Sequence, residues 1–219
     1  MLDDFKVQTG NATSKLRMRA FVQCFAWTTG LLANLFSESA NPSRAADAFA
    51  NRLVRKGQLK SQVFEVQEVA INERPLCCSG LECEPDYDAL AYSLERRFSG
   101  SSKPTRVFWP SLQFSRRYGR WTGADSYSCS HKLSHDVLIT AVWLHFLKNS
   151  PAVALDHWVP ERWLQSERRR GVWLGPIPDA LIKDGEQLTA IEIGGNYPAT
   201  WIRHHVERFQ AAGWAWQLW

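Results

Sequence analysis

Hydrophobic residues in the first quarter of the chain recur at the three- and four-residue spacing of helices. The clearest case runs over residues 44–56, directly after Asn41-Pro42-Ser43, a typical helix start. Gly57 predicts its end. An earlier helix is predicted after Thr13 or Ser14, either of which can cap it. The apolar face of the 44–56 helix is predicted to consist of Ala45, Ala48, Phe49, Leu53 and Val54.

Strand patterns follow this helix. Residues 62–71 carry valines between polar residues and predict a strand, and residues 105–112 predict a second one, rich in aromatic and β-branched residues. A helix is predicted between them over residues 89–97. A short helical piece is also predicted over residues 31–36, between the first helix and the helix over 44–56. The first part of the chain therefore predicts helix, helix, basic helix and a β-ribbon.

The C-terminal part predicts a different order. Two apolar runs between Gly175 and Gly195 flank a polar turn, which indicates a β-hairpin. The elements predicted around it are a helix over 133–148, a strand over 154–159, a helix over 198–212 and a strand over 214–219. The run Glu167-Arg168-Arg169-Arg170 is interpreted as a loop or strand edge that faces solvent or nucleic acid.

Size and composition set limits on the class of protein. The chain has 219 residues, 45% of them hydrophobic and 12% aromatic, enough to build cores, so global disorder is excluded. A small polar patch over residues 100–103 is the best linker, and we expect domains over 1–100 and 101–219. No leader pattern and no apolar run of about 18 residues is present, so we expect a cytoplasmic protein without a membrane partner.

The five cysteines have irregular spacing, and reduced thiols are the default for a cytosolic chain. Cys77, Cys83, Cys129 and His131 could form a zinc site, but the C-x-x-C spacing that favours zinc is absent. We therefore expect thiols that pack or face solvent, and no bound cofactor.

Cations gather on and just after the helix over residues 44–56. Together with the formal net charge of +4, they permit a polyanionic partner, because several cations on one short helix can neutralise phosphates. Three helices followed by a ribbon is the order of a winged helix-turn-helix, whose basic helix enters the DNA major groove. A solvated basic helix on a protein-binding winged helix is the alternative. The predicted DNA-binding residues are Arg44, Arg52, Arg55, Lys56 and Lys60.

Two carboxylates belong to the predicted hairpin, Asp179 at the start of one strand and Glu192 within the other. Acids on adjacent strands can hold a divalent cation such as Mg²⁺, which can activate water for phosphodiester cleavage. An ordinary hairpin with acids that face water is the alternative. His135-Asp136 also invites a metal or acid–base interpretation, but a polar first helical turn, with the acid favoured by the helix dipole, is the commoner explanation.

Pro178-Asp179, the hairpin and Glu192 resemble the core of the PD-(D/E)XK nuclease-like fold. That fold reads helix, three strands, helix, strand. The resemblance implies catalytic and metal-binding roles for Asp179 and Glu192 if the protein is active. The family lysine, two residues after the glutamate, is replaced by Gly194, which implies a nuclease scaffold without catalysis. Lys183 and Tyr197 are weak candidates for the vacated role.

The whole pattern resembles the replication-relaxation family of plasmid and mobile-element proteins. The resemblance depends on the N-terminal winged helix, on Leu133-Ser-His135-Asp136 and on the Pro178-Asp179 hairpin that ends in Ile191-Glu192-Ile193. It implies an α+β protein, a winged helix-turn-helix followed by a PD-(D/E)XK-like α/β domain. The implied function is DNA binding in replication, mobilisation or transcription control. The implied partners are double-stranded DNA, a second copy of the chain, and replication or mobilisation proteins. A magnesium-dependent endonuclease and a protein–protein assembly factor are the alternative functions.

Overall fold

The computed structural model describes residues 12–67, 71–80, 84–119 and 130–219 of a mixed α+β protein. The chain divides into two compact units, residues 1–66 with 103–144 and residues 67–102 with 145–219. These units do not coincide with the expected ranges 1–100 and 101–219, because the chain leaves the first unit after residue 66 and returns to it at residue 103. The long helix α6 (Ser130–Asn149) runs across the division at residue 144.

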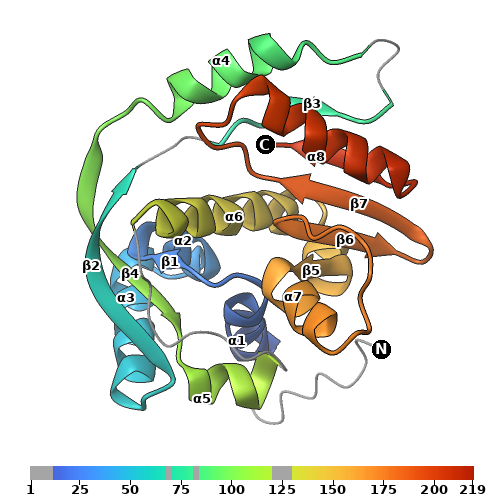
Figure 1. Ribbon diagram of the computed structural model, residues 1–219. Helices are drawn as coiled ribbons and strands as arrows, with labels where there is room; N and C mark the ends of the chain where they lie inside the picture. The colour runs from blue at the N-terminus through green and yellow to red at the C-terminus, as the bar shows by residue number, and fades with distance from the viewer. Residues whose placement is uncertain (1–11, 68–70, 81–83, 120–129) are drawn as a thin grey trace. The chain divides into compact units, whose positions relative to one another are not determined.

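Unit 1 contains helices and a small three-stranded sheet (Figure 1). The sheet order is β1-β4-β2, and β1 pairs antiparallel with β4. The elements in chain order are α1 (Ala12–Gln23), β1 (Trp27–Thr28), α2 (Thr29–Ala33), the 3₁₀ turn η1 (Asn34–Phe36), α3 (Pro42–Arg55), β2 (Leu59–Gln67), β4 (Ser102–Pro110), α5 (Leu112–Phe114), the π-helical turn η2 (Ser115–Gly119) and most of α6.

Helix α3 begins and ends where its sequence signals predict. The Asn41 side chain accepts a hydrogen bond from the Arg44 amide, and Pro42 occupies the first turn. At the other end Gly57 has a φ of 67°, and its amide and that of Gln58 bond back to the last turn. The buried face consists of Ala46, Phe49, Ala50 and Leu53, which confirms the prediction for Phe49 and Leu53. Ala45 and Val54 are half-buried, and the prediction of Ala48 on that face is wrong because Ala48 is exposed.

Aromatic rings fill the core of unit 1. Phe21 of α1 lies 5.5 Å from Trp27 and 6.3 Å from Phe114, measured between ring centroids, and it stacks on Phe49 of α3. Trp27 also contacts Trp143 of α6. The Thr140 hydroxyl donates to the Ala26 carbonyl at 2.6 Å and so fixes α6 to the segment before β1.

Unit 2 is built on a five-stranded sheet of order β3-β8-β7-β6-β5. All pairs are antiparallel except β7 and β8, which are parallel and joined by α8. The elements in chain order are β3 (Cys77–Cys78), α4 (Tyr87–Arg97), the end of α6, the π-helical turn η3 (Val153–His157), β5 (Trp158–Pro160), α7 (Glu161–Arg169), β6 (Ala180–Asp184), β7 (Gln187–Glu192), α8 (Ala199–Ala211) and β8 (Ala215–Leu218).

The predicted helix, hairpin, second helix and last strand are confirmed as α6, β6–β7, α8 and β8. The strand predicted over 154–159 is largely wrong, because residues 153–157 form the helical turn η3 and β5 begins only at Trp158. Two further local predictions in this part of the chain are wrong. Glu167–Arg169 belong to helix α7 and not to a loop or strand edge. Helix α6 begins at Ser130, so His135 and Asp136 lie beyond its first turn.

Helices α4 and α8 lie side by side, and they enclose a core with β3, β7 and β8 (Figure 1). Leu94 of α4 is fully buried in this core, among Ile202, Val206 and Phe209 of α8. None of the helices in the described residues is long and apolar enough to cross a membrane.

Candidate functional site

The two predicted acids converge at one end of the β6–β7 hairpin. The antiparallel register pairs Ala180 with Ile191, and one further step places Asp179 opposite Glu192. Glu192 is the last residue of β7 and is buried, whereas Asp179 is half-buried directly before β6. The spacing of the hairpin, counted from its turn, is enough to explain this convergence.

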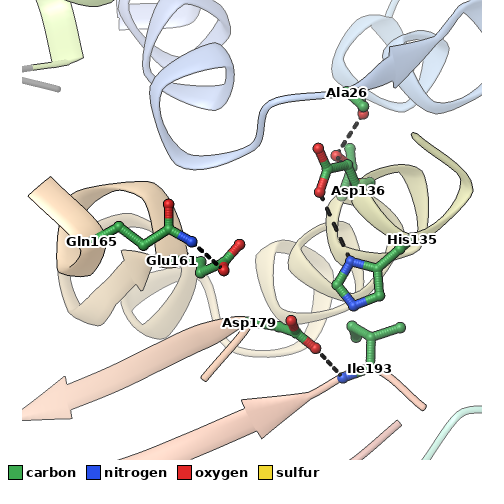
Figure 2. Close-up of polar contacts among 8 residues, drawn as sticks. Ala26, His135, Asp136, Glu161, Gln165, Asp179 and Ile193 are labelled. Carbon is green, nitrogen blue, oxygen red and sulfur yellow. Dashed lines mark hydrogen bonds and ion pairs between the residues drawn. The ribbon is translucent and has the colours of Figure 1, made fainter. Parts of the chain in front are cut away.

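Both carboxylates are engaged in the structure of unit 2. The Ile193 amide donates to Asp179 Oδ2 at 2.7 Å, so the acid closes the strand end across the hairpin (Figure 2). The Asp179 carbonyl accepts from the Glu161 amide, which ties the same residue to the start of α7. Glu192 Oε1 lies 3.4 Å from His205 Nδ1. The two acids are therefore fixed by three different elements.

His205 was not among the predicted site residues. It stacks on Trp201 at 3.7 Å, and Trp201 stacks on Tyr197 at 3.9 Å, so the rings form a column along α8. Burial, followed by the nearby Arg208, lowers the pKa of His205 below its ordinary value of 6.5, whereas Asp179 acts to raise it. The four-residue spacing of Tyr197, Trp201, His205 and Phe209 in the predicted helix is the signal that could have identified this residue.

Leu94 fills the space beside Gly194, the position at which the resemblance to the nuclease-like fold predicts a lysine. A Cβ atom added at Gly194 would lie 2.1 Å from Leu94 Cδ2 and 2.7 Å from Leu94 Cδ1. Carbon atoms in contact are normally separated by about 3.5–4.0 Å. Any side chain at position 194, lysine included, thus requires α4 or its leucine to move.

The other candidates for the lysine role lie elsewhere. Lys183 is exposed near the turn of the hairpin, where it pairs with Leu188, three pairs away from Ala180 and Ile191. The Tyr197 ring is packed between Trp201 and the backbone at Gly195. Among the described residues, no group of three or more His, Cys, Asp or Glu side chains is placed to hold a metal ion. Cys83, Cys129 and the His131 side chain, three members of the predicted zinc set, lie outside the described residues.

The predicted DNA-binding residues are all exposed in unit 1: Arg44, Arg52, Arg55, Lys56 and Lys60. A helix turns by about 100° per residue, which places Arg44, Arg52 and Arg55 within about 80° of one another. The buried residues of α3 lie on the opposite side. The Arg52 guanidinium lies 5.5 Å from the centroid of the Phe49 ring, which restricts that one side chain. The α3 cations thus form one exposed stripe.

His135 and Asp136 form an internal pair in unit 1. His135 Nδ1 lies 3.8 Å from Asp136 Oδ1, and Asp136 is buried (Figure 2). The backbone carbonyl of Asp136 accepts from the Thr140 hydroxyl, the same hydroxyl that bonds Ala26. The pair therefore belongs to the packing of α6.

No protein-family model, curated protein or solved structure matches this chain.

Proposed function

We propose that the protein binds double-stranded DNA through the exposed cations of α3, and that unit 2 is a nuclease-like domain that does not cleave DNA. The observation that carries the proposal is the stripe formed by Arg44, Arg52 and Arg55, with Lys56 and Lys60 directly after it. Exposed cations on one helix face are arranged to contact successive phosphates and to release counterions.

The element order of unit 1 supports a winged helix-turn-helix. A helix, a short strand, two further helical segments and two strands occur in that order, and the third strand pairs with the first in the sheet β1-β4-β2. In such folds the helix before the ribbon is the one that enters the major groove. Here that helix is α3. The ribbon differs in one respect, since the chain between β2 and β4 passes through unit 2.

The element order of unit 2 supports a PD-(D/E)XK-like domain. The antiparallel strands β5, β6 and β7 are followed by α8 and by β8 parallel to β7. With α6 as the first helix, this order is similar to the helix, three strands, helix and strand expected for that fold, except that α7 is inserted between β5 and β6 and most of α6 belongs to unit 1. Leu94 packed against Gly194 removes the position from which the motif lysine would act, which is why we propose that this domain does not cut DNA.

The biological setting that we propose follows the resemblance to replication-relaxation proteins. The protein would act in the cytoplasm on a plasmid or mobile element, in replication, mobilisation or transcription control. A homodimer would read two half-sites, as is common for helix-turn-helix proteins.

The proposal is tested by replacing Arg44 and Arg55 together with alanine. Because each lost phosphate contact reduces the slope of log affinity against log salt by about 0.9, the double variant is expected to bind every duplex more weakly, with a slope smaller by about 2. A gel shift or anisotropy titration at several salt concentrations measures both quantities.

The matched control is Lys15→Ala with Lys132→Ala, which removes the same charge from exposed positions of α1 and α6 in unit 1. It is expected to keep the wild-type salt slope. Equal effects of the two double variants would contradict binding through α3. No salt-dependent DNA binding by the wild-type protein would favour the assembly factor.

A magnesium-dependent endonuclease is the second candidate, because Asp179 and Glu192 do converge at one strand end. Supercoiled plasmid incubated with the protein and Mg²⁺ or Mn²⁺ separates the two. We expect no nicking. Nicking that disappears in Asp179→Asn and Glu192→Gln would establish the endonuclease.

A further inference from the structure

The segment after α7 presents two apolar side chains to solvent next to three arginines. Leu174 is 88% exposed and Val172 is 64% exposed, the two highest values among the large apolar residues of the described chain. Arg168, Arg169 and Arg170 precede them and are exposed. We refer to residues 168–174 as the arginine-leucine tip.

The tip has a defined backbone. Gly171 has a φ of 72°, its amide bonds the Arg168 carbonyl at 3.0 Å, and the Val172 amide bonds the Glu167 carbonyl at 2.9 Å. This is the glycine-based helix ending in which the residue after glycine usually packs an apolar side chain back on the last turn. Here the facing residue of that turn is Glu167, and Val172 points into solvent.

The far side of the tip is fixed as well. Trp173 packs on Trp214 with ring centroids 5.6 Å apart, and its indole N–H donates to the Pro176 carbonyl at 2.9 Å. The Arg168 guanidinium donates to the Gly175 carbonyl. A Cβ at Gly175 would lie 2.9 Å from the Trp214 ring, so glycine permits this close packing. The tip is thus held at both ends while Leu174 projects between them.

The Arg170 guanidinium is paired with the Glu167 carboxylate at 2.7 Å, whereas Arg169 is exposed. We propose that the arginine-leucine tip is a second DNA contact, in which Leu174 enters the minor groove as an apolar wedge and Arg169 contacts a flanking phosphate. This inference rests on the proposed DNA-binding function and adds a second site to it. Proteins that bind the minor groove frequently insert a leucine or similar side chain between base steps beside arginines. The groove is about 6 Å wide, which suits one side chain on a narrow tip.

Two features favour DNA over an anionic membrane surface as the occupant. The only aromatic residue of the tip, Trp173, is engaged by Trp214 and Pro176, whereas membrane-surface segments place tryptophan in the interface. The cations are all arginines, whose planar donors match phosphates in two-point contacts. Two apolar side chains offer little area for lipid but are sufficient for one wedge.

The test uses the full-length protein with Leu174→Ser and duplexes that carry 2-aminopurine, a base whose fluorescence rises when it is unstacked. Wild-type protein is expected to raise the fluorescence, and Leu174→Ser is expected to abolish the rise and to weaken binding by about 10- to 100-fold, the value of burying one leucine. Arg169→Ala is expected to keep the fluorescence rise and to lower the salt slope by about 0.9.

Tyr92→Ser is the matched control, because Tyr92 is an exposed apolar residue of unit 2 outside the tip and is expected to behave as wild type. If Leu174→Ser equals wild type while Arg44→Ala with Arg55→Ala weakens binding, the wedge is refuted and the proposed function stands. If the wild-type protein binds no DNA, both are refuted. If Leu174→Ser loses binding only to phosphatidylserine–phosphatidylcholine vesicles, a membrane surface replaces DNA as the partner.

Discussion

The charged residues of α3 and those of the β6–β7 hairpin are placed in opposite ways. Arg44 and Arg55 project from the exposed side of a helix whose other side builds the core of unit 1. Asp179 instead accepts a hydrogen bond from the Ile193 amide, and Glu192 lies within 3.4 Å of His205 Nδ1; both contacts are within unit 2. The cations remain accessible to a ligand, whereas the acids contribute to the fold that contains them.

This difference separates binding from catalysis. A residue that contacts a ligand can be exposed without a structural role, and its replacement changes affinity alone. A catalytic residue needs room for substrate, and in unit 2 the space beside Gly194, two residues after Glu192, is filled by Leu94. The comparison therefore predicts that substitutions around the acids change stability, and that substitutions on α3 do not.

The largest stability effect is expected from Leu94→Ala. Leu94 is fully buried between α4, α8 and the strand end at Gly194, so its truncation leaves a cavity and is expected to cost about 2–5 kcal/mol in the free energy of unfolding. Urea denaturation measures the loss. Arg44→Ala with Arg55→Ala, examined in the same way, is expected to stay within about 0.5 kcal/mol of wild type.

Gly194→Ala sharpens the same comparison. Alone it places a methyl group in the space that the Leu94 side chain occupies, and it is expected to lower the free energy of unfolding by about 1–3 kcal/mol. In the Leu94→Ala background the atoms that it would meet are gone, so most of that cost is expected to vanish. A double-mutant cycle gives the coupling. Additive effects would mean that Leu94 does not fill the space beside Gly194.

Much of the element order could be predicted from the sequence because each element carries its own local signals. Asn41, Pro42 and Gly57 delimit α3, and the turn around Gly185 sets the register that brings Asp179 opposite Glu192. The Glu167–Arg169 prediction failed for a physical reason. Three consecutive arginines suggested a solvent-facing loop, but Arg168 and Arg169 form the exposed last turn of α7, after the buried residues Leu164, Ser166 and Glu167.

The parts that could not be predicted depend on contacts between distant segments. Leu94 and Gly194 are one hundred positions apart in the numbering, and nothing local in either segment indicates that they touch. The two-unit division has the same cause, since the described part of residues 67–102 joins unit 2 through the pairing of β3 with β8 and the packing of α4 on α8. His205 could be predicted in part: its four-residue spacing from other aromatic residues is present in the sequence, but its contact with Glu192 is not indicated there.

A smaller effect is expected from Asp179, whose carboxylate accepts from the buried Ile193 amide. Asp179→Ala leaves that amide without its acceptor and is expected to cost about 1–3 kcal/mol. Asp179→Asn keeps an oxygen at the same place and is expected to cost less than half as much. Thermal or urea unfolding compares the two. Equal stability of both variants and wild type would mean that the Asp179 carboxylate has no structural role, and would favour a catalytic role for it.

The smallest effect concerns the protonation of His205. Its pKa in the folded protein lies below its ordinary value of 6.5, chiefly because it is buried, so the unfolded chain binds the proton more tightly. The stabilisation that neutral His205 contributes is complete above about pH 7.5 and declines as the pH falls through 6.5 toward the pKa of the folded protein.

His205→Phe keeps a ring that can stack on Trp201 and removes the titration, so the decline in melting temperature between about pH 7.5 and 5.5 is expected to be shallower than in wild type. His204→Gln, one residue away and exposed, is expected to retain the decline, because it leaves the burial of His205 unchanged. A steeper decline in His205→Phe would contradict this sign, because it would mean that Glu192 stabilises the charged imidazolium and that the ion pair contributes to the stability of unit 2 at low pH.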